Sequence, residues 1–247
     1  MNYKRIDINC DVGEGVGNEA DLFPMISSCN IACGGHAGSK ETIKQCLKLA
    51  EEFNVRIGAH PSYPDRENFG RVSMSISDTD LIKSIGNQLK LFMTECNELG
   101  ATLHHIKPHG ALYNDIAKNE HLANVFLTAI LPYKNNVVLY VPCKSVIEAL
   151  AKANNFKIMK EAFADRNYNN DLSLVSRKQD KALISNGKEV LEHLVLMCNE
   201  NQVRTVNGEK IPIQADTFCI HGDTPTAFQI LTYITEHLQE HNLQVKT

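Results

Sequence analysis

The sequence of 247 residues lacks any uninterrupted apolar run of about 18 residues, the length that a membrane-spanning helix needs. Its first residues, MNYKRIDINCDVGEG, lack the apolar segment and the small-residue cleavage site of a secretory signal peptide. Positive charge is not in excess either, because 25 Lys and Arg stand against 29 Asp and Glu, for a net charge of -4. We therefore expect a cytoplasmic protein that binds neither a membrane nor nucleic acid.

Closely spaced cysteine pairs are also absent, because none of the eight cysteines belongs to a C-x-x-C motif. In a compartment that keeps thiols reduced, cysteines without such a motif usually serve as small hydrophobic residues of the core, and we expect that role for most of them. Cys33 and Cys143 lie near the ends of predicted strands, so a nucleophilic role is the alternative for these two. No linker rich in Pro, Ser or Gly divides the chain, and 43% hydrophobic residues suffice for a sizeable core. Residues 1–247 are therefore predicted to form one domain.

What the sequence does contain is a regular alternation of short apolar runs with longer segments of helical period. This pattern is typical of repeated βα units around a mostly parallel sheet. Seven strands are predicted, over residues 5–11, 29–33, 55–60, 103–107, 137–141, 157–163 and 217–221. Four helices are readable, over residues 39–53, 77–100, 186–199 and 224–241. Ser39 and Ser77 are natural N-caps for the first two, and Asn207–Gly208 predicts a hairpin turn within 206–213.

Polar side chains follow nearly every predicted strand. In LHHIKPHGALYN (103–114) the apolar run stops at Lys107 and His109, and Pro108 and Gly110 restrict the backbone that directs them. Because the carboxyl ends of parallel strands meet at one face of a barrel, we expect these side chains to form a site there. The charged residues and histidines at these ends are Asp11, Glu14, His36, His60, Lys107, His109, Asp165, Arg166, His221 and Asp223.

The ten histidines divide into two groups. Four lie beside or close to a Gly or Pro at a predicted strand end and are predicted to line the pocket: His36, His60, His109 and His221. The other six, on helices or within a strand, are predicted to be structural: His104, His105, His121, His193, His237 and His241. The glycines form neither G-x-x-x-x-G-K-[ST] nor a dinucleotide fingerprint, so the chain has no nucleotide-binding motif of its own.

Six ordered motifs resemble the LamB/YcsF family, the A subunits of bacterial ATP-dependent 5-oxoprolinases. They are distributed over nearly the whole chain: DINCDVGEGVG (7–17), SSCNIACGGHAG (27–38), GAHPSYPD (58–65) with FGR (69–71), HIKPHGALYN (105–114), EAFADRNY (161–168) and CIHGDTP (219–225). The resemblance implies an α/β fold, an irregular seven-stranded β/α (TIM-like) barrel of the glycoside hydrolase/deacetylase type. It also implies cleavage of 5-oxo-L-proline to L-glutamate, coupled to hydrolysis of ATP to ADP and phosphate. ATP would be a co-substrate of a complex with subunits B and C.

Three places depart from the family motifs. Val72 stands where a second arginine is usual, and Asn68 replaces a glycine. DLSLVSR (171–177) replaces DGxLVPR, so that Leu172 and Ser176 stand for a glycine and a proline. The loss of a glycine is expected to mean that φ is negative there in this chain.

The residue types suit the implied reaction, because a lactam is a stabilised amide. Opening it requires activation by phosphorylation of the carbonyl oxygen, a base for water and an acid for the ring nitrogen. Asp11 and either His60 or His109 are predicted to move these protons, and Lys107 to stabilise the negative oxygen or bind the substrate carboxylate. The predicted substrate-binding residues are Asn9, Glu14, Gly34, Gly35, His36, Arg71, Gly110, Arg166, His221 and Asp223. The two arginines are alternative carboxylate clamps, and the three glycines would let backbone N–H groups approach an anion.

Two other functions are compatible with the same residues. In a metal-dependent C–N hydrolase of the deacetylase type, Asp11, His36 and His60 would hold a divalent ion that activates water. In a non-catalytic subunit, the pocket would only hold the substrate for catalysis elsewhere. The sequence therefore leaves a bound divalent metal undecided.

Overall fold

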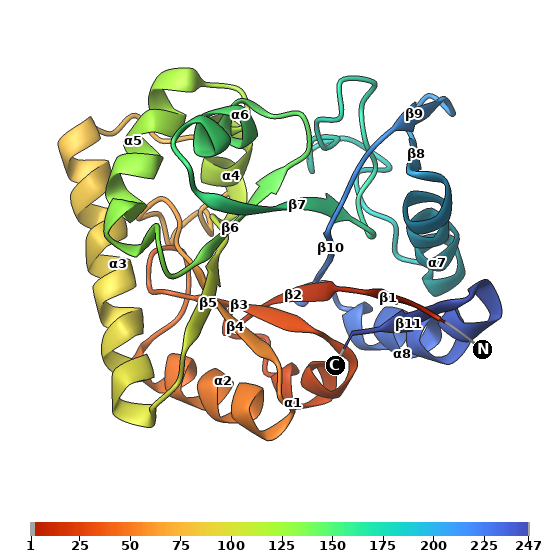
Figure 1. Ribbon diagram of the computed structural model, residues 1–247, viewed down its shortest axis with the longest axis horizontal. Coiled ribbons are helices and arrows are strands. Elements are labelled where there is room, and N and C mark those ends of the chain that lie inside the picture. The colour runs from red at the N-terminus through yellow and green to blue at the C-terminus, as the bar shows by residue number, and fades with distance from the viewer. Residues whose placement is uncertain (1–2, 247) are drawn as a thin grey trace.

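The computed structural model describes residues 3–246. Seven parallel strands close into a barrel in the order β10-β2-β3-β4-β5-β6-β7, with helices packed around it (Figure 1). The barrel strands are β2 Ile8–Val12, β3 Ser28–Ala32, β4 Arg56–His60, β5 Leu103–Ile106, β6 Val138–Pro142, β7 Lys157–Phe163 and β10 Thr217–His221. The register between β4 and β5 shifts between Ile57 and Gly58. The predicted irregular, seven-stranded β/α barrel is thus confirmed.

Helices α2 and α3 begin at the serine caps that the sequence predicts. At the start of α2 (Lys40–Glu52), the Ser39 hydroxyl accepts a hydrogen bond from the Thr42 N–H, and the Thr42 hydroxyl accepts one from the Ser39 N–H. α3 (Asp78–Leu99) follows Ser77 and ends at Gly100, where φ is 68°. The other helices are α1 Glu19–Leu22, α4 Gly110–Ile116, α5 Glu120–Ile130, α6 Val146–Ala153, α7 Gly187–Val195 and α8 Ala227–His237. Within residues 3–246 we find no helix whose length and apolarity would let it cross a membrane.

Short strands outside the barrel complete the fold. The predicted strand 5–11 is wrong at its start, because the chain forms two strands there. β1 (Lys4–Ile6) pairs in parallel with β11 (Leu243–Val245), close to both ends of the chain (Figure 1). The break falls at Asp7, whose buried carboxylate accepts hydrogen bonds from the hydroxyls of Ser28 and Thr217 on neighbouring barrel strands. The predicted turn at Asn207–Gly208 is confirmed, with a φ of 86° at Gly208, but the hairpin starts before the predicted residue 206: β8 (Gln202–Arg204) pairs antiparallel with β9 (Lys210–Pro212).

The barrel interior is polar as well as tightly packed. The His105 ring stacks on Tyr140, with ring centroids 4.0 Å apart, and its Nε2 lies 2.7 Å from Asn30 Oδ1. Asn30 in turn donates to Asn9 Oδ1 and to Asp11 Oδ1. These contacts link the middle of the barrel to a carboxylate near the carboxyl ends of the strands.

Replacing Gly58 with alanine is expected to destabilise the fold by about 1–3 kcal/mol, the usual cost of overpacking a core. A Cβ at position 58 would lie 2.0 Å from His105 Nε2, and both residues are held in neighbouring strands. Urea denaturation measures the effect. Gly86→Ala is the matched control, because among the described residues an added Cβ in the middle of α3 meets no neighbouring side chain within 4 Å. That control should gain roughly 0.5–1 kcal/mol, and equal losses in both variants would contradict the packing described here.

Candidate active site

A cavity of about 450 Å³ lies at the carboxyl ends of the barrel strands. His60 and His221 are the last residues of β4 and β10, and Lys107 follows β5 directly. Gly110 has a φ of 57°, and an added Cβ would lie 2.5 Å from the Gly70 carbonyl oxygen, so only glycine fits there. The structure places these predicted site residues on the cavity wall: Asp11, His60, Arg71, Lys107, His109, Gly110, Arg166 and His221.

Lys107 is a buried cation on the wall of this cavity, with 1% of its surface exposed. Its Nζ lies 2.9 Å from Asp11 Oδ1, 2.9 Å from Glu161 Oε1 and 3.3 Å from Asn9 Oδ1. Burial alone would lower the pKa of Lys107, but the charges of Asp11 and Glu161 outweigh burial and raise that pKa well above its ordinary value. The ammonium therefore stays charged and can stabilise negative charge on a bound molecule.

Asp11 is the carboxylate that this lysine shares with a histidine. Its Oδ1 accepts hydrogen bonds from Lys107 and from Asn30, at 2.9 and 2.8 Å, and its Oδ2 lies 3.3 Å from His60 Nε2. Burial favours the protonated acid, but the interactions with His60 and Lys107 outweigh it and hold the pKa of Asp11 well below its usual value. Asp11 is thus an ionised carboxylate at the cavity, a chemically suitable proton acceptor.

His60 and His109 point two ring nitrogens at each other. His60 Nδ1 lies 2.7 Å from the Lys107 carbonyl oxygen, and His109 Nε2 lies 3.0 Å from the Phe69 carbonyl oxygen. Because a carbonyl oxygen only accepts, both of these nitrogens must carry hydrogen. In the neutral rings the remaining lone pairs, on His60 Nε2 and His109 Nδ1, then face each other at 3.0 Å. Such lone pairs repel unless a proton or a metal ion lies between them.

Glu14 and His36 lie behind His109 rather than on the cavity wall. The rings of His36 and His109 stack with centroids 3.6 Å apart, and His36 Nε2 is 2.9 Å from Glu14 Oε1. Burial lowers the pKa of His36 to about 2, so this ring is neutral. Burial and then the charge of Asp11 raise the pKa of Glu14 well above its usual value. Glu14 and His36 therefore contact His109 but do not line the cavity.

Gly34 and Gly35 form a tight turn after β3 and do not line the cavity. The Gly34 N–H donates to the Ala37 carbonyl at 2.7 Å, so it is not available to an anion. At Gly35 an added Cβ would lie 2.4 Å from Ser62 Oγ and from Gln88 Oε1. The expectation that the Gly34 N–H approaches a ligand is therefore wrong, because close packing and the turn already use these glycines.

The two predicted carboxylate clamps differ in what already holds them. Arg71 forms an ion pair with Asp223 and lies over the Phe69 ring. Arg166 donates from Nε to the Ala182 carbonyl and from Nη2 to the Val175 carbonyl, at 3.1 and 2.6 Å. Burial lowers the pKa of Arg166 to about 10, so it remains charged at neutral pH. Both guanidinium groups reach the cavity, but Arg166 also anchors the loop that follows β7.

Of the departures from the family motifs, Val72 and Ser176 line the same cavity, and Leu172 lines a second, smaller chamber. The backbone at Leu172 has a φ of 66°. The expectation of a negative φ is therefore wrong at this position. The loop keeps the left-handed turn although leucine is strained in it, at a cost of about 1–2 kcal/mol.

The pattern of polar residues at strand ends did not identify Glu161 and Asn30, which contact Lys107 and Asp11. Glu161 contacts Lys107 from within β7, and Asn30 holds Asp11 and His105 from within β3. A charged or amide residue inside an otherwise apolar strand is the sequence signal that identifies both. This signal predicts a site residue only when it is known which face of the strand points into the barrel.

The cysteines are all free in the structure. Cys33 is buried, and burial raises the pKa of its thiol. Cys143 is half-buried and lines a second, smaller chamber. Burial is thus the observed state of Cys33, and it disfavours the thiolate that a nucleophile needs.

Several clusters of side chains have the donors that a divalent metal ion requires. In one, single ligand atoms from Asp11, His60 and His109 lie within 4.8 Å of one another. His36 belongs to a different cluster, with Glu14 and His109. The predicted combination of Asp11, His36 and His60 is therefore replaced by one in which His109 takes the place of His36. Histidines whose other ring nitrogen donates to a carbonyl are the usual arrangement of metal ligands, so the first cluster fits such an ion.

The closed barrel and the charged cavity define the chain as a β/α-barrel protein with a buried polar site at the carboxyl ends of its strands. It belongs to the LamB/YcsF family, whose model matches residues 6–247. It is 38% identical to the A subunit of 5-oxoprolinase from Haemophilus influenzae (strain PittEE), over 98% of this chain and 99% of the relative. It is 37% identical to that of Pyrococcus abyssi, over 98% and 96%. The crystal structure of the lactam utilization protein from Thermus thermophilus superposes with a TM-score of 0.91 at 30% identity, covering 98% of this chain and 99% of that one.

Proposed function

We propose that this chain is the A subunit of a cytoplasmic ATP-dependent 5-oxoprolinase, a hydrolase that opens the cyclic amide 5-oxo-L-proline to L-glutamate. The observation that carries the proposal is the contact of an ionised Asp11 with the buried Lys107 at 2.9 Å, on the wall of a cavity whose size suits a small molecule. The relatives that bear the name of this subunit, and the structure named for lactam utilization, support the choice of substrate.

The residues of the cavity suit the steps of lactam hydrolysis. Asp11 takes a proton from a water molecule, whose oxygen bonds to the lactam carbonyl carbon. Lys107 stabilises the negative charge that builds up on the oxygen atoms bonded to this carbon. The C–N bond then breaks, and a proton reaches the ring nitrogen from the side of His60 and His109.

ATP enters the proposal through companion subunits. The chain has no Walker loop and no kinase-type glycine loop. We infer that subunits B and C perform the step that uses ATP, and that this barrel receives the lactam phosphorylated on its carbonyl oxygen. A first water molecule adds to the carbonyl carbon and the C–N bond breaks, which leaves an acyl phosphate, and a second water molecule hydrolyses the acyl phosphate to L-glutamate and phosphate.

Reconstitution tests this division of labour. The purified chain alone should neither form L-glutamate from 5-oxoproline nor hydrolyse ATP, and addition of subunits B and C should produce both activities in equal amounts. Glutamate and ADP are measured in the same reaction. ATP-dependent ring opening by the chain alone would refute the division, and absence of ring opening in the full complex would refute the function itself.

A second candidate, a metal-dependent C–N hydrolase, is favoured by the two lone pairs of His60 and His109 that face each other beside Asp11. These three residues would hold the ion, which would lower the pKa of a bound water molecule. Metal analysis of the preparations used for reconstitution distinguishes the candidates. A stoichiometric metal, together with hydrolysis of an N-acetyl or cyclic amide that needs no ATP, would favour the second.

A further inference from the structure

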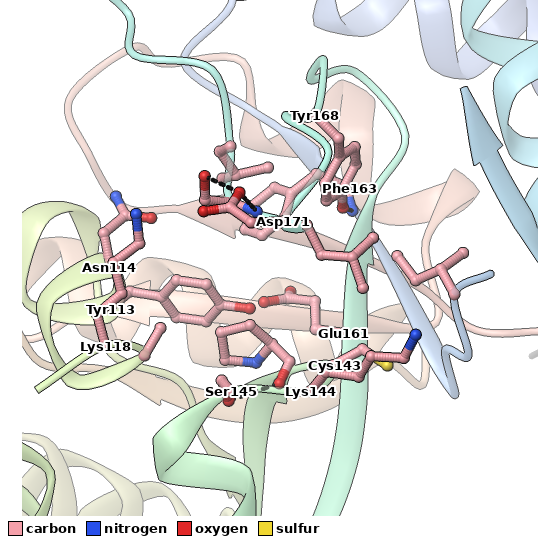
Figure 2. A pocket seen from close by; sticks show the side chains of 16 residues that line it. Tyr113, Asn114, Lys118, Cys143, Lys144, Ser145, Glu161, Phe163, Tyr168 and Asp171 are labelled. Carbon is pink, nitrogen blue, oxygen red and sulfur yellow. Dashed lines mark hydrogen bonds between the residues drawn. The ribbon is translucent and has the colours of Figure 1, made fainter. Parts of the chain in front are cut away.

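A second chamber, of about 170 Å³, adjoins the main cavity on the side of β7 (Figure 2). Its volume lies below the roughly 300–1,000 Å³ of sites for drug-sized ligands, so it suits part of a small molecule. The two spaces share a wall made of Tyr113, Asn114, Lys118, Phe163, Ser173 and Leu174. The main cavity and the side chamber therefore lie next to each other, on either side of these residues.

Glu161 and Tyr113 are buried polar residues that point into the side chamber. Only 2% of Glu161 and 4% of Tyr113 is exposed. Figure 2 shows the Tyr113 hydroxyl and the Glu161 carboxylate directed toward each other. Glu161 Oε1 has the Lys107 ammonium as its ion-pair partner at 2.9 Å, whereas Glu161 Oε2 and the Tyr113 hydroxyl, which face each other, have no hydrogen-bond partner of regular geometry among residues 3–246. Buried polar groups without such partners are uncommon, and they mark a place where a ligand supplies the missing contacts.

The charges around Glu161 indicate what kind of group is missing. Its neighbour Lys107 lies 2.9 Å from Glu161 Oε1 and also 2.9 Å from Asp11 Oδ1. One ammonium thus serves two buried carboxylates, which leaves this cluster of three residues one positive charge short. Burial and the charge of Glu161 raise the pKa of Tyr113, so its hydroxyl stays neutral and can accept a hydrogen bond. A group that carries positive charge and donates several hydrogen bonds complements both residues.

We propose that the side chamber is an ammonium subsite, in which Glu161 and Tyr113 hold the amino group that the opening of a lactam ring sets free. The inference rests on the proposed function, since ring opening converts the amide nitrogen of the substrate into the ammonium of an amino acid. The rim of the chamber carries Lys118 and Lys144, cations suited to a carboxylate of the same molecule. The ligand class is therefore a zwitterionic amino acid with its ammonium at Glu161.

Titration calorimetry with the purified full chain tests the subsite, using L-glutamate and glutarate as probes. Glutarate has both carboxylates of glutamate and lacks only the amino group. The wild-type chain should bind L-glutamate roughly 10- to 100-fold more tightly than glutarate, the effect of one charge-assisted hydrogen bond. Glu161→Gln should remove this preference, and Tyr113→Phe should reduce it several-fold, while glutarate binding changes little in either variant.

Glu95→Gln is the matched control. Glu95 is another buried glutamate whose oxygens lack hydrogen-bond partners among the described residues, but it lies on α3 and pairs with Lys40 and Lys44. This variant should keep the full preference for L-glutamate. Equal binding of the two probes by the wild type, no binding of L-glutamate, or an unchanged preference in both Glu161→Gln and Tyr113→Phe would overturn the subsite.

The outcomes separate this inference from the proposed function. A preference for L-glutamate that depends on Glu161, found together with a reconstituted complex that does not open 5-oxoproline, would keep the ammonium subsite and reject the activity. A complex that opens 5-oxoproline, with a chain that does not distinguish L-glutamate from glutarate, would keep the activity and reject the subsite.

Discussion

Asp11→Asn is expected to lower the turnover of the reconstituted complex by about 10²–10⁴-fold, the contribution of a positioned acid or base. Asparagine preserves the shape of the side chain and can still accept the hydrogen bond from Asn30, but it cannot take a proton from water. His109→Ala should have a loss of similar size, because His109 Nδ1 is 3.0 Å from His60 Nε2, next to the same carboxylate. Initial rates of glutamate formation measure both effects.

Asp78→Asn is the matched control for Asp11→Asn, because Asp78 is an exposed residue that pairs with His121 on the surface. Its turnover should equal that of the wild type. Thermal melts show whether each variant is folded at the assay temperature. If Asp11→Asn lost activity only in proportion to folded protein, Asp11 would have a structural role. If turnover were unchanged, the chain would be a substrate-binding subunit.

Lys107→Met is expected to abolish turnover and to destabilise the chain by about 3–5 kcal/mol, the cost of removing one partner from buried ion pairs. Methionine fills nearly the same space, so the loss reports the charge and not the volume. Without the ammonium, Glu161 is a buried carboxylate with no cation in the contacts described above, and Asp11 keeps only His60, at 3.3 Å. Chemical denaturation at neutral pH measures the change in the free energy of unfolding.

Two further variants make this prediction specific. Lys210→Met removes an exposed lysine that pairs with Glu200, and it should change stability by less than about 1 kcal/mol. The double variant Lys107→Met with Glu161→Gln also removes the unpaired charge of Glu161, so it should be more stable than Lys107→Met alone. Strictly additive losses in the double variant would mean that Lys107 and Glu161 do not interact.

Much of the barrel could be predicted because its signals are local. Each buried parallel strand is a short apolar run, and helices α2, α3, α5, α6 and α7 begin at a serine or asparagine cap, signals that neighbouring residues determine. The error at β1 and β2 came from a contact that is not local, because the apolar run continues through Ile6 while β1 leaves the barrel to pair with β11. Leu172 shows the same limit, since the surrounding loop holds a left-handed turn that leucine by itself does not favour.

The sequence by itself determined that ionisable residues gather at one face, because parallel strands all present their carboxyl ends on the same side. It identified Asp11 and Lys107 as members of that group although they are 96 positions apart. Only the tertiary structure decided which of these side chains meet. Closure of the barrel placed Glu161 beside Lys107 and Tyr113, turned His36 behind His109, and paired the ring nitrogens of His60 and His109. Those contacts depend on strand register and on the shape of the packed interior, which no short stretch of sequence specifies.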